Sequence, residues 1–195
     1  MQNYTELPKD LPVPADDGAC DHLSSLTLPS INLSATSGRA VNLADLPGWV
    51  VIYCYPMTGR PGVPLPDGWD QIPGARGCTP QSCGFRDHYV ELKKLNVQIF
   101  GLSSQTAEYQ REAAERLHLP FELLSDSSLR FANALGLPTF EIEGMRLIKR
   151  VTLIARDAKI VKHFYPIFPP DKNAEDVIHW LKRHLSQTTA LLPGS

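Results

Sequence analysis

The sequence predicts an α/β protein with a mixed central sheet that is flanked by helices on both sides. Apolar strand patterns alternate with amphipathic helix patterns between residues 49 and 135, which is typical of parallel strands joined by helical crossovers. The run Trp49–Tyr55 is apolar throughout, so we expect a strand that is buried on both faces. Two later strand patterns are separated only by Arg156–Ala158, and this spacing indicates an antiparallel hairpin.

Length and composition indicate one globular domain with extensions. The chain has 195 residues, of which 43% are hydrophobic and 21% charged, and its formal net charge is -2. This charge argues against nucleic acid or an anionic membrane as a partner, and no apolar run approaches the ~18 residues of a membrane span. The first residues lack the basic and apolar regions of a signal peptide, so we expect a cytoplasmic location.

We expect three segments along the chain. Residues 1–20 are rich in proline and are predicted to form an extended arm, residues 21–188 the folded domain, and residues 189–195 a tail. Inside the domain, residues 57–77 contain four prolines and five glycines and show little periodicity. They are predicted to form an insertion loop, and loops of this length in a compact domain are usually functional or disordered.

The remaining elements follow in order along the domain. A hairpin of residues 28–33 and 39–43 comes before the buried strand. After the insertion, Thr79 is the expected N-cap of a helix and Pro80 its first residue. The apolar stripe of this helix is Phe85, Tyr89, Leu92 and Leu95. The later elements are strand 97–103, helix 106–118, strand 121–124, helix 128–135, strands 150–154 and 159–165, and helix 173–185.

The four cysteines are too few for a disulfide scaffold and do not have the spacing of a metal site. Cys54 lies in the buried strand and is expected to be structural, whereas Cys20 lies in the arm and is interpreted as an incidental exposed thiol. Cys78 directly precedes the predicted helix, where the backbone N–H groups and the helix dipole favour a thiolate. Cys83 lies five residues later, roughly 8 to 9 Å away on a helix, so a disulfide between the two requires the first turns to unwind.

The segment Gly77–Asp87, with the sequence GCTPQSCGFRD, and the preceding Tyr55–Pro56 resemble the active site of the peroxiredoxins. Within the AhpC/TSA superfamily, the segment is most similar to the Q-type, or bacterioferritin-comigratory-protein-like, subfamily. The resemblance continues through the next strand, helix and strand and covers roughly residues 23–185. It implies a thioredoxin fold with an N-terminal β-hairpin extension.

The resemblance also implies roles for individual residues. By this resemblance, Cys78 corresponds to the peroxidatic cysteine, which peroxide oxidises to a sulfenic acid. Cys83 corresponds to the resolving cysteine of an atypical two-cysteine enzyme. Pro56 falls on the proline that shields the thiolate, and Arg150 on the arginine that polarises the peroxide. Arg146 and Lys149 compete with Arg150 for that role.

The implied enzyme is a thiol peroxidase that reduces hydrogen peroxide and organic hydroperoxides without a cofactor or a metal. A thioredoxin-like or glutaredoxin-like reductant is expected to reduce its intramolecular disulfide. The expected oligomeric state is a monomer or a weak homodimer.

One feature departs from the family pattern, in which the proline, a threonine and the cysteine form a compact PxxxTxxC motif. Here Pro56 and Cys78 are 22 positions apart, and Ala75 stands where the threonine belongs. We expect Thr58 to supply the hydroxyl if the insertion bulges outward, with Thr79 as the second choice.

Two other functions remain open from the sequence. The altered motif is compatible with a redox sensor or binding module that has weakened catalysis on the same fold. A disulfide oxidoreductase is the weaker alternative, because CTPQSC does not have the CxxC spacing of those enzymes.

Overall fold

The computed structural model describes residues 7–189 and shows a mixed sheet between helices. Its seven strands lie in the order β2-β1-β5-β4-β3-β8-β9. Strands β3 (Trp49–Cys54), β4 (Val97–Ser103) and β5 (Leu123–Ser125) are parallel. Strands β8 (Val151–Arg156) and β9 (Lys159–Phe164) form the predicted antiparallel hairpin, with β8 beside β3. The mixed α/β sheet is therefore confirmed.

The N-terminal hairpin is present but starts later than predicted. Its strands are β1 (Asn32–Ala35) and β2 (Ala40–Asn42), and β1 joins the main sheet through β5. The preceding residues run along the β8–β9 hairpin instead, where the backbone N–H of Leu28 donates to the carbonyl of Ala158 at 2.8 Å. Because the backbone groups of these residues are hydrogen-bonded to the β8–β9 hairpin, they do not join β1, and β1 is shorter than predicted.

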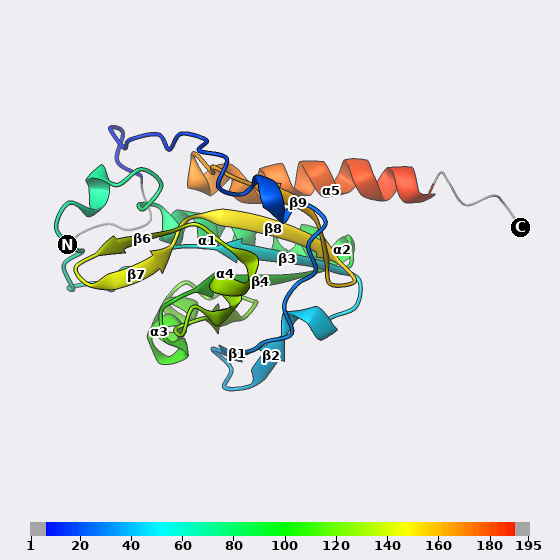
Figure 1. Ribbon diagram of the computed structural model, residues 1–195, viewed down its shortest axis with the longest axis horizontal. Helices are drawn as coiled ribbons and strands as arrows, with labels where there is room; N and C mark the ends of the chain where they lie inside the picture. The colour runs from blue at the N-terminus through cyan, green and yellow to red at the C-terminus, as the bar shows by residue number, and fades with distance from the viewer. Residues whose placement is uncertain (1–6, 190–195) are drawn as a thin grey trace, which may run out of the picture.

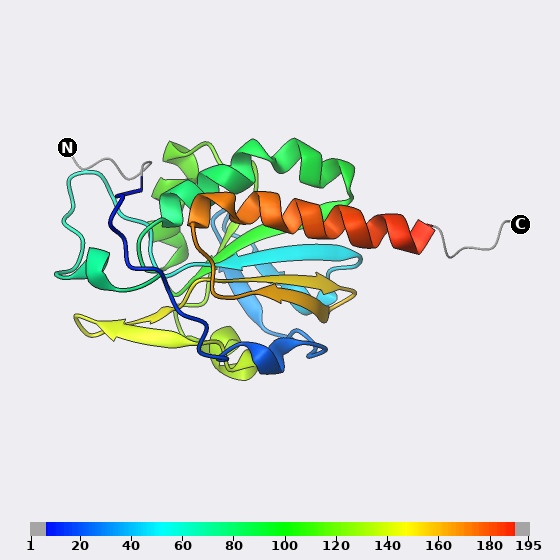
Figure 2. The same cartoon turned by 90° about the horizontal axis from the view of Figure 1, so that it is seen from above.

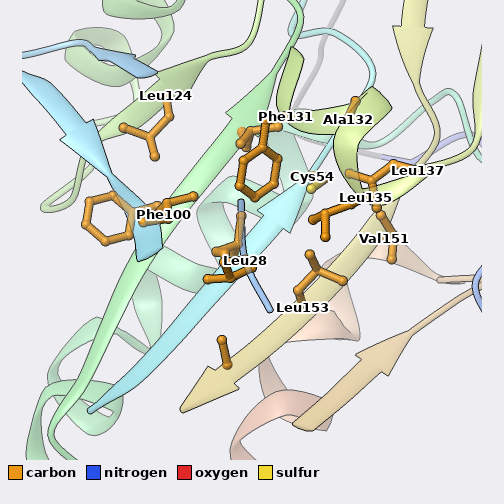
Figure 3. Packing of buried hydrophobic residues seen from close by; sticks show 14 of the residues in the cluster. Leu28, Cys54, Phe100, Leu124, Phe131, Ala132, Leu135, Leu137, Val151 and Leu153 are labelled. Carbon is orange, nitrogen blue, oxygen red and sulfur yellow. The ribbon is translucent and has the colours of Figure 1, made fainter. Parts of the chain in front are cut away.

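Helices cover both faces of the sheet. The helices α1 (Cys78–Asp87) and α5 (Asn173–Thr189) lie side by side on one face (Figures 1 and 2), where they bury Phe85 and Val177. On the opposite face, α4 (Arg130–Leu135) packs over a second core that includes Phe131. Figure 3 shows the ring of Phe131 among aliphatic side chains from several elements. The buried strand β3 contributes to both cores, as its apolar sequence predicts.

The connections contain short helical elements. Helix α3 (Ala107–Arg116) joins β4 to β5, and its N-cap Thr106 accepts a hydrogen bond from the N–H of Tyr109. The 3-10 turns are η1 (Asp21–Leu23), η2 (Leu43–Asp45), η3 (Trp69–Gln71) and η4 (Pro170–Lys172).

The start of α1 differs from the prediction. Cys78, not Pro80, is the first helical residue, and the N-cap is Gly77 with φ +105° rather than Thr79. A Cβ atom at Gly77 would lie 2.3 Å from the Cγ of Pro170, so both the backbone conformation and the space select glycine. The correction moves Cys78 into the first helical turn.

The predicted helix after the insertion is also divided. It consists of α1 and the shorter α2 (Tyr89–Lys94), which are separated at His88 with φ -96° and ψ 6°. The predicted apolar stripe continues across the break, because Phe85 and Leu92 belong to the same core.

A hairpin that the sequence does not predict is formed by β6 (Thr139–Ile142) and β7 (Met145–Ile148), which are paired outside the main sheet. Both views show this hairpin at the same end of the molecule as the insertion loop. The insertion docks on the hairpin through the buried Trp69, whose ring centroid lies 6.0 Å from that of Phe140. Trp69, Ala75 and Leu147 form a small third core.

The interpretation of Cys20 as an exposed thiol is wrong. Its side chain is 1% exposed and packs in the core beneath α4. Burial raises the pKa of this thiol to about 12, which disfavours a reactive thiolate. Cys54 is buried in the same core, as its place in β3 predicts.

The described part of the predicted arm follows the surface of the domain. Residues 11–18 contain no helix or strand. The carboxylate of Asp17 in this segment pairs with Lys149 at 3.0 Å. The predicted arm and tail also include residues 1–6 and 190–195, which lie outside the described residues.

Within residues 7–189, no helix combines the length and the apolar character that a membrane crossing requires.

We expect Trp69→Ala to release the insertion without unfolding the sheet. The ring supplies most of the small core between the insertion and the hairpin, and truncating a buried tryptophan typically costs about 3–5 kcal/mol. Hydrogen exchange should accelerate within residues 57–77 and stay unchanged in β3 and β4. The control is Val63→Ala, at a residue that is 49% exposed in the same loop, which should leave exchange nearly unchanged.

Candidate functional site

The site begins with the thiol of Cys78, which is 5% exposed at the N-terminus of α1. Its Sγ donates to the carbonyl of Ala75 at 3.5 Å and accepts a hydrogen bond from Nη2 of Arg150 at 3.2 Å. The positive end of the helix dipole acts in the same direction as the guanidinium, because both stabilise negative charge on sulfur. The sulfur thus lies at the N-terminus of α1 and in direct contact with a guanidinium.

Arg150 immediately precedes β8 and is 3% exposed. The pairing of Cys54 with Val151 brings this end of β8 beside the end of β3. Besides the sulfur, the guanidinium donates to the carbonyls of Gly74, Ala75 and Arg76 and to Oε1 of Gln81. In the described chain, no ion pair with a carboxylate is formed by Arg150, so its hydrogen bonds go to neutral oxygens and one sulfur.

A chain of buried amides and a hydroxyl orients this arginine. Since Arg150 can only donate, Gln81 turns its oxygen toward the guanidinium and its amide nitrogen toward Oδ1 of Asn173, at 3.0 Å. The hydroxyl of Thr152 donates to the same Oδ1 at 2.7 Å. The network joins α1, β8 and α5 at the site.

A second network holds the chain that follows β3. The carbonyl of Pro56 accepts a hydrogen bond from the Ser103 hydroxyl at 2.9 Å. Gln105 binds the buried Thr58 through three contacts: Oε1 accepts from its N–H at 2.9 Å and from its hydroxyl at 3.2 Å, and Nε2 donates to its carbonyl at 3.2 Å. The end of β4 therefore fixes the path of the first residues of the insertion.

Cys83 lies on the same helix as Cys78 and is half-buried, and both are free thiols. Burial raises the pKa of the Cys83 thiol, and the nearby Arg86 partly offsets this effect. Because an intact helix separates positions i and i+5 by more than a disulfide allows, the structure corresponds to the reduced state.

Only a small hollow, of about 10 Å³, adjoins the sulfur of Cys78. Met57, Gly59 and Thr79 are among the residues that line it. Among residues 7–189, no cluster of three or more His, Cys, Asp or Glu side chains has the arrangement of a metal site.

Comparisons with known proteins show the family of this chain. The family model described as Redoxin matches residues 24–178. The chain is 33% identical over 161 residues to "Peroxiredoxin Bcp" of Escherichia coli K12, an alignment that spans 80% of this chain and 93% of that protein. The chain belongs to the peroxiredoxins. It is also 28% identical over 157 residues to "Peroxiredoxin Q, chloroplastic" of Sedum lineare, covering 80% of this peroxiredoxin and 76% of that one.

Solved structures show the same fold. Peroxidoxin BcpB of Mycobacterium tuberculosis superposes with a TM-score of 0.67 at 24% identity, covering 82% of this chain and 96% of that one. The bacterioferritin comigratory protein of Xanthomonas campestris, studied for its alkyl peroxide reduction activity, gives a TM-score of 0.63 at 20% identity and covers 90% and 99%. The predicted thioredoxin fold is confirmed.

The structure brings Cys78 and Arg150 into direct contact, places Cys83 on the same helix, and binds Thr58 to Gln105. Two further residues of the site, Gln81 and Gln105, are not predicted from the sequence. For Gln81 the sequence offers one signal, its position between the two cysteines of the same helix. Gln105 carried none, because its contact with Thr58 spans 47 positions.

We expect Gln105→Leu to loosen the chain that follows Pro56. The variant removes three hydrogen bonds and leaves the N–H of the buried Thr58 without an acceptor, at a cost of about 1–3 kcal/mol. Amide exchange at Thr58 should accelerate, and kcat/KM for hydrogen peroxide should fall about tenfold. In Gln105→Glu the acceptor remains, so slower exchange than in Gln105→Leu is expected; equal exchange in both variants would contradict this role.

Proposed function

We propose that this peroxiredoxin reduces hydrogen peroxide and organic hydroperoxides with Cys78 as the peroxidatic cysteine. One observation carries the proposal: a buried guanidinium that has no carboxylate partner in the described chain donates a hydrogen bond to the sulfur of Cys78. A buried charge needs a compensating partner, and an ionised Cys78 would supply it. The same guanidinium can bind the peroxide next to the thiolate.

In the first step, the thiolate of Cys78 attacks the terminal oxygen of the peroxide. An S–O bond forms while the O–O bond breaks, so sulfur is oxidised to a sulfenic acid and the peroxide is reduced. The leaving hydroxide or alkoxide takes up a proton and departs as water or an alcohol. Arg150 keeps its charge throughout and stabilises the negative charge that moves onto the leaving oxygen. Pro56 is assigned as the shield of the thiolate.

In the second step, the thiolate of Cys83 attacks the sulfur of the sulfenic acid. The S–S bond forms, the S–O bond breaks, and the hydroxyl leaves as water after taking up a proton. The first turns of α1 must unwind, and glycine at positions 77 and 84 lowers the cost of that change. A thioredoxin-like or glutaredoxin-like dithiol then reduces the disulfide. We assign the protein to the cytoplasm as a monomer or weak homodimer.

Replacing Cys78 and replacing Cys83 should have different effects on peroxide reduction. Cys78→Ser is expected to abolish peroxide consumption in an assay with a thioredoxin system, because no other cysteine adjoins Arg150 in the described chain. Cys83→Ser should complete the first step only, so mass spectrometry should find a stable sulfenic acid on Cys78. In the wild type, peroxide should produce a linked peptide that contains residues 78 and 83.

Full turnover by Cys78→Ser would disprove the assignment. A wild-type protein that forms the disulfide with peroxide but does not turn over with thioredoxin or glutaredoxin would indicate the redox sensor instead.

The source of the active-site hydroxyl can be tested by a pair of variants. We assign it to Thr58, which Gln105 holds at the start of the insertion, while Thr79 lines the hollow beside Cys78. Thr58→Val should lower kcat/KM for hydrogen peroxide by roughly tenfold to a hundredfold, as expected for loss of one hydrogen bond to a reacting group, and Thr79→Val should have a smaller effect. The reverse order would transfer the role to Thr79.

A further inference from the structure

A large cavity lies next to the site and has no part in the mechanism described above. Its volume is about 690 Å³, which is within the usual range for pockets that bind small molecules. Four parts of the chain line it: the insertion, the segment that leads from β4 into α3, the turn after β5 at Ser127, and the β6–β7 hairpin. It thus lies beyond the carboxyl ends of β4 and β5, where α/β sheets commonly bind ligands.

The cavity and the hollow at Cys78 share a wall. Met57 and Leu65 line both spaces, so these two side chains separate the sulfur from the larger volume. Both residues are only partly buried, and methionine is unbranched and flexible. A change of rotamer at this wall would connect the two spaces without moving the backbone.

The volumes of the hollow and of the cavity indicate which part of a substrate each of them can hold. The hollow of about 10 Å³ is close to the smallest space that holds one water molecule. The terminal oxygen of a peroxide can approach the sulfur there, but an alkyl group has no room. The organic part of a larger hydroperoxide must therefore pass the wall of Met57 and Leu65.

We propose that the cavity binds the organic group of an uncharged alkyl hydroperoxide, and that Val63–Pro66 of the insertion and Met145 of β7 determine this specificity. This inference rests on the proposed function of Cys78. The apolar side chains of Val63, Leu65 and Met145 face the cavity, and burial of an alkyl chain against them would favour binding. The charged lining residues Asp67, Glu143 and Arg146 include both signs, sum to only -1 and are all exposed, so the cavity holds no buried charge that would select an ionised tail.

The cavity is held open by contacts on both sides of Val63–Pro66. Before this segment, the guanidinium of Arg60 lies 3.9 Å from the centroid of the Tyr109 ring on α3. After it, the N–H of Asp67 donates to Glu143 of the hairpin at 2.9 Å, and Trp69 packs on the same hairpin. Pro64 and Pro66 restrict the backbone between these anchors. The insertion is therefore a fixed wall of the cavity.

The test compares substrates of different size in variants that fill the cavity. Ser127→Trp and Met145→Trp place an indole at two exposed lining residues, one in the turn after β5 and one on β7. The matched control is Ser128→Trp, at an exposed neighbour that does not line the cavity. For each protein, kcat/KM is measured with hydrogen peroxide and with n-octyl hydroperoxide, and circular dichroism checks folding.

Both filling variants should lose tenfold or more in kcat/KM for n-octyl hydroperoxide and stay within about twofold for hydrogen peroxide. Each methylene group of the substrate that a variant keeps in water should lower kcat/KM by a factor of about four. Exclusion of two methylene groups therefore accounts for a tenfold loss. Ser128→Trp should match the wild type on both substrates. Folded filling variants that lose nothing, or that lose equally on both substrates, would overturn the inference while leaving the peroxidase intact. A wild type that reduces neither peroxide would instead refute the proposed function, and this inference with it.

Discussion

The arrangement of the chain around Cys78 depends on one buried cation, the guanidinium of Arg150. Arg150 is enclosed by carbonyl oxygens from the end of the insertion, the amide oxygen of Gln81 and the sulfur of Cys78. Removing a guanidinium from water costs several kcal/mol unless its donors are satisfied, so these acceptors have to converge on it. One side chain thereby joins β8, the insertion and α1, and in the proposed mechanism it pairs with the thiolate of Cys78.

The insertion separates two halves of an active-site motif that the fold brings back together. Its first residues are fixed by Gln105 from the end of β4, and its last residues by Arg150. Between them, Trp69 anchors it to the β6–β7 hairpin. The extra chain lines both the hollow at the sulfur and the cavity beside it, and the proposed selection of the substrate rests on this arrangement.

Under the proposed mechanism, helix α1 must satisfy two opposite requirements. In the reduced state it places Cys78 at its N-terminus, and close packing supports it, because Gly77 and Gly84 both approach the η4 segment. To form the disulfide between Cys78 and Cys83, the same turns must open. Glycine serves both states, since its lack of a side chain permits the close approach and its backbone freedom makes the opening easier.

The sequence by itself determined the sheet and most helices, because hydrophobic periodicity is a local signal, and the segment Gly77–Asp87 was enough to indicate the peroxiredoxin family. It also placed Arg150 at the start of β8. It did not reveal that α1 begins at Cys78, since the space beside Pro170 selects Gly77 as the cap. The burial of Cys20, the β6–β7 hairpin and the contacts of Gln81 and Gln105 were decided only by the tertiary structure. Each of these depends on partners distant in sequence, and a pattern read along one chain carries no information on which distant groups will meet.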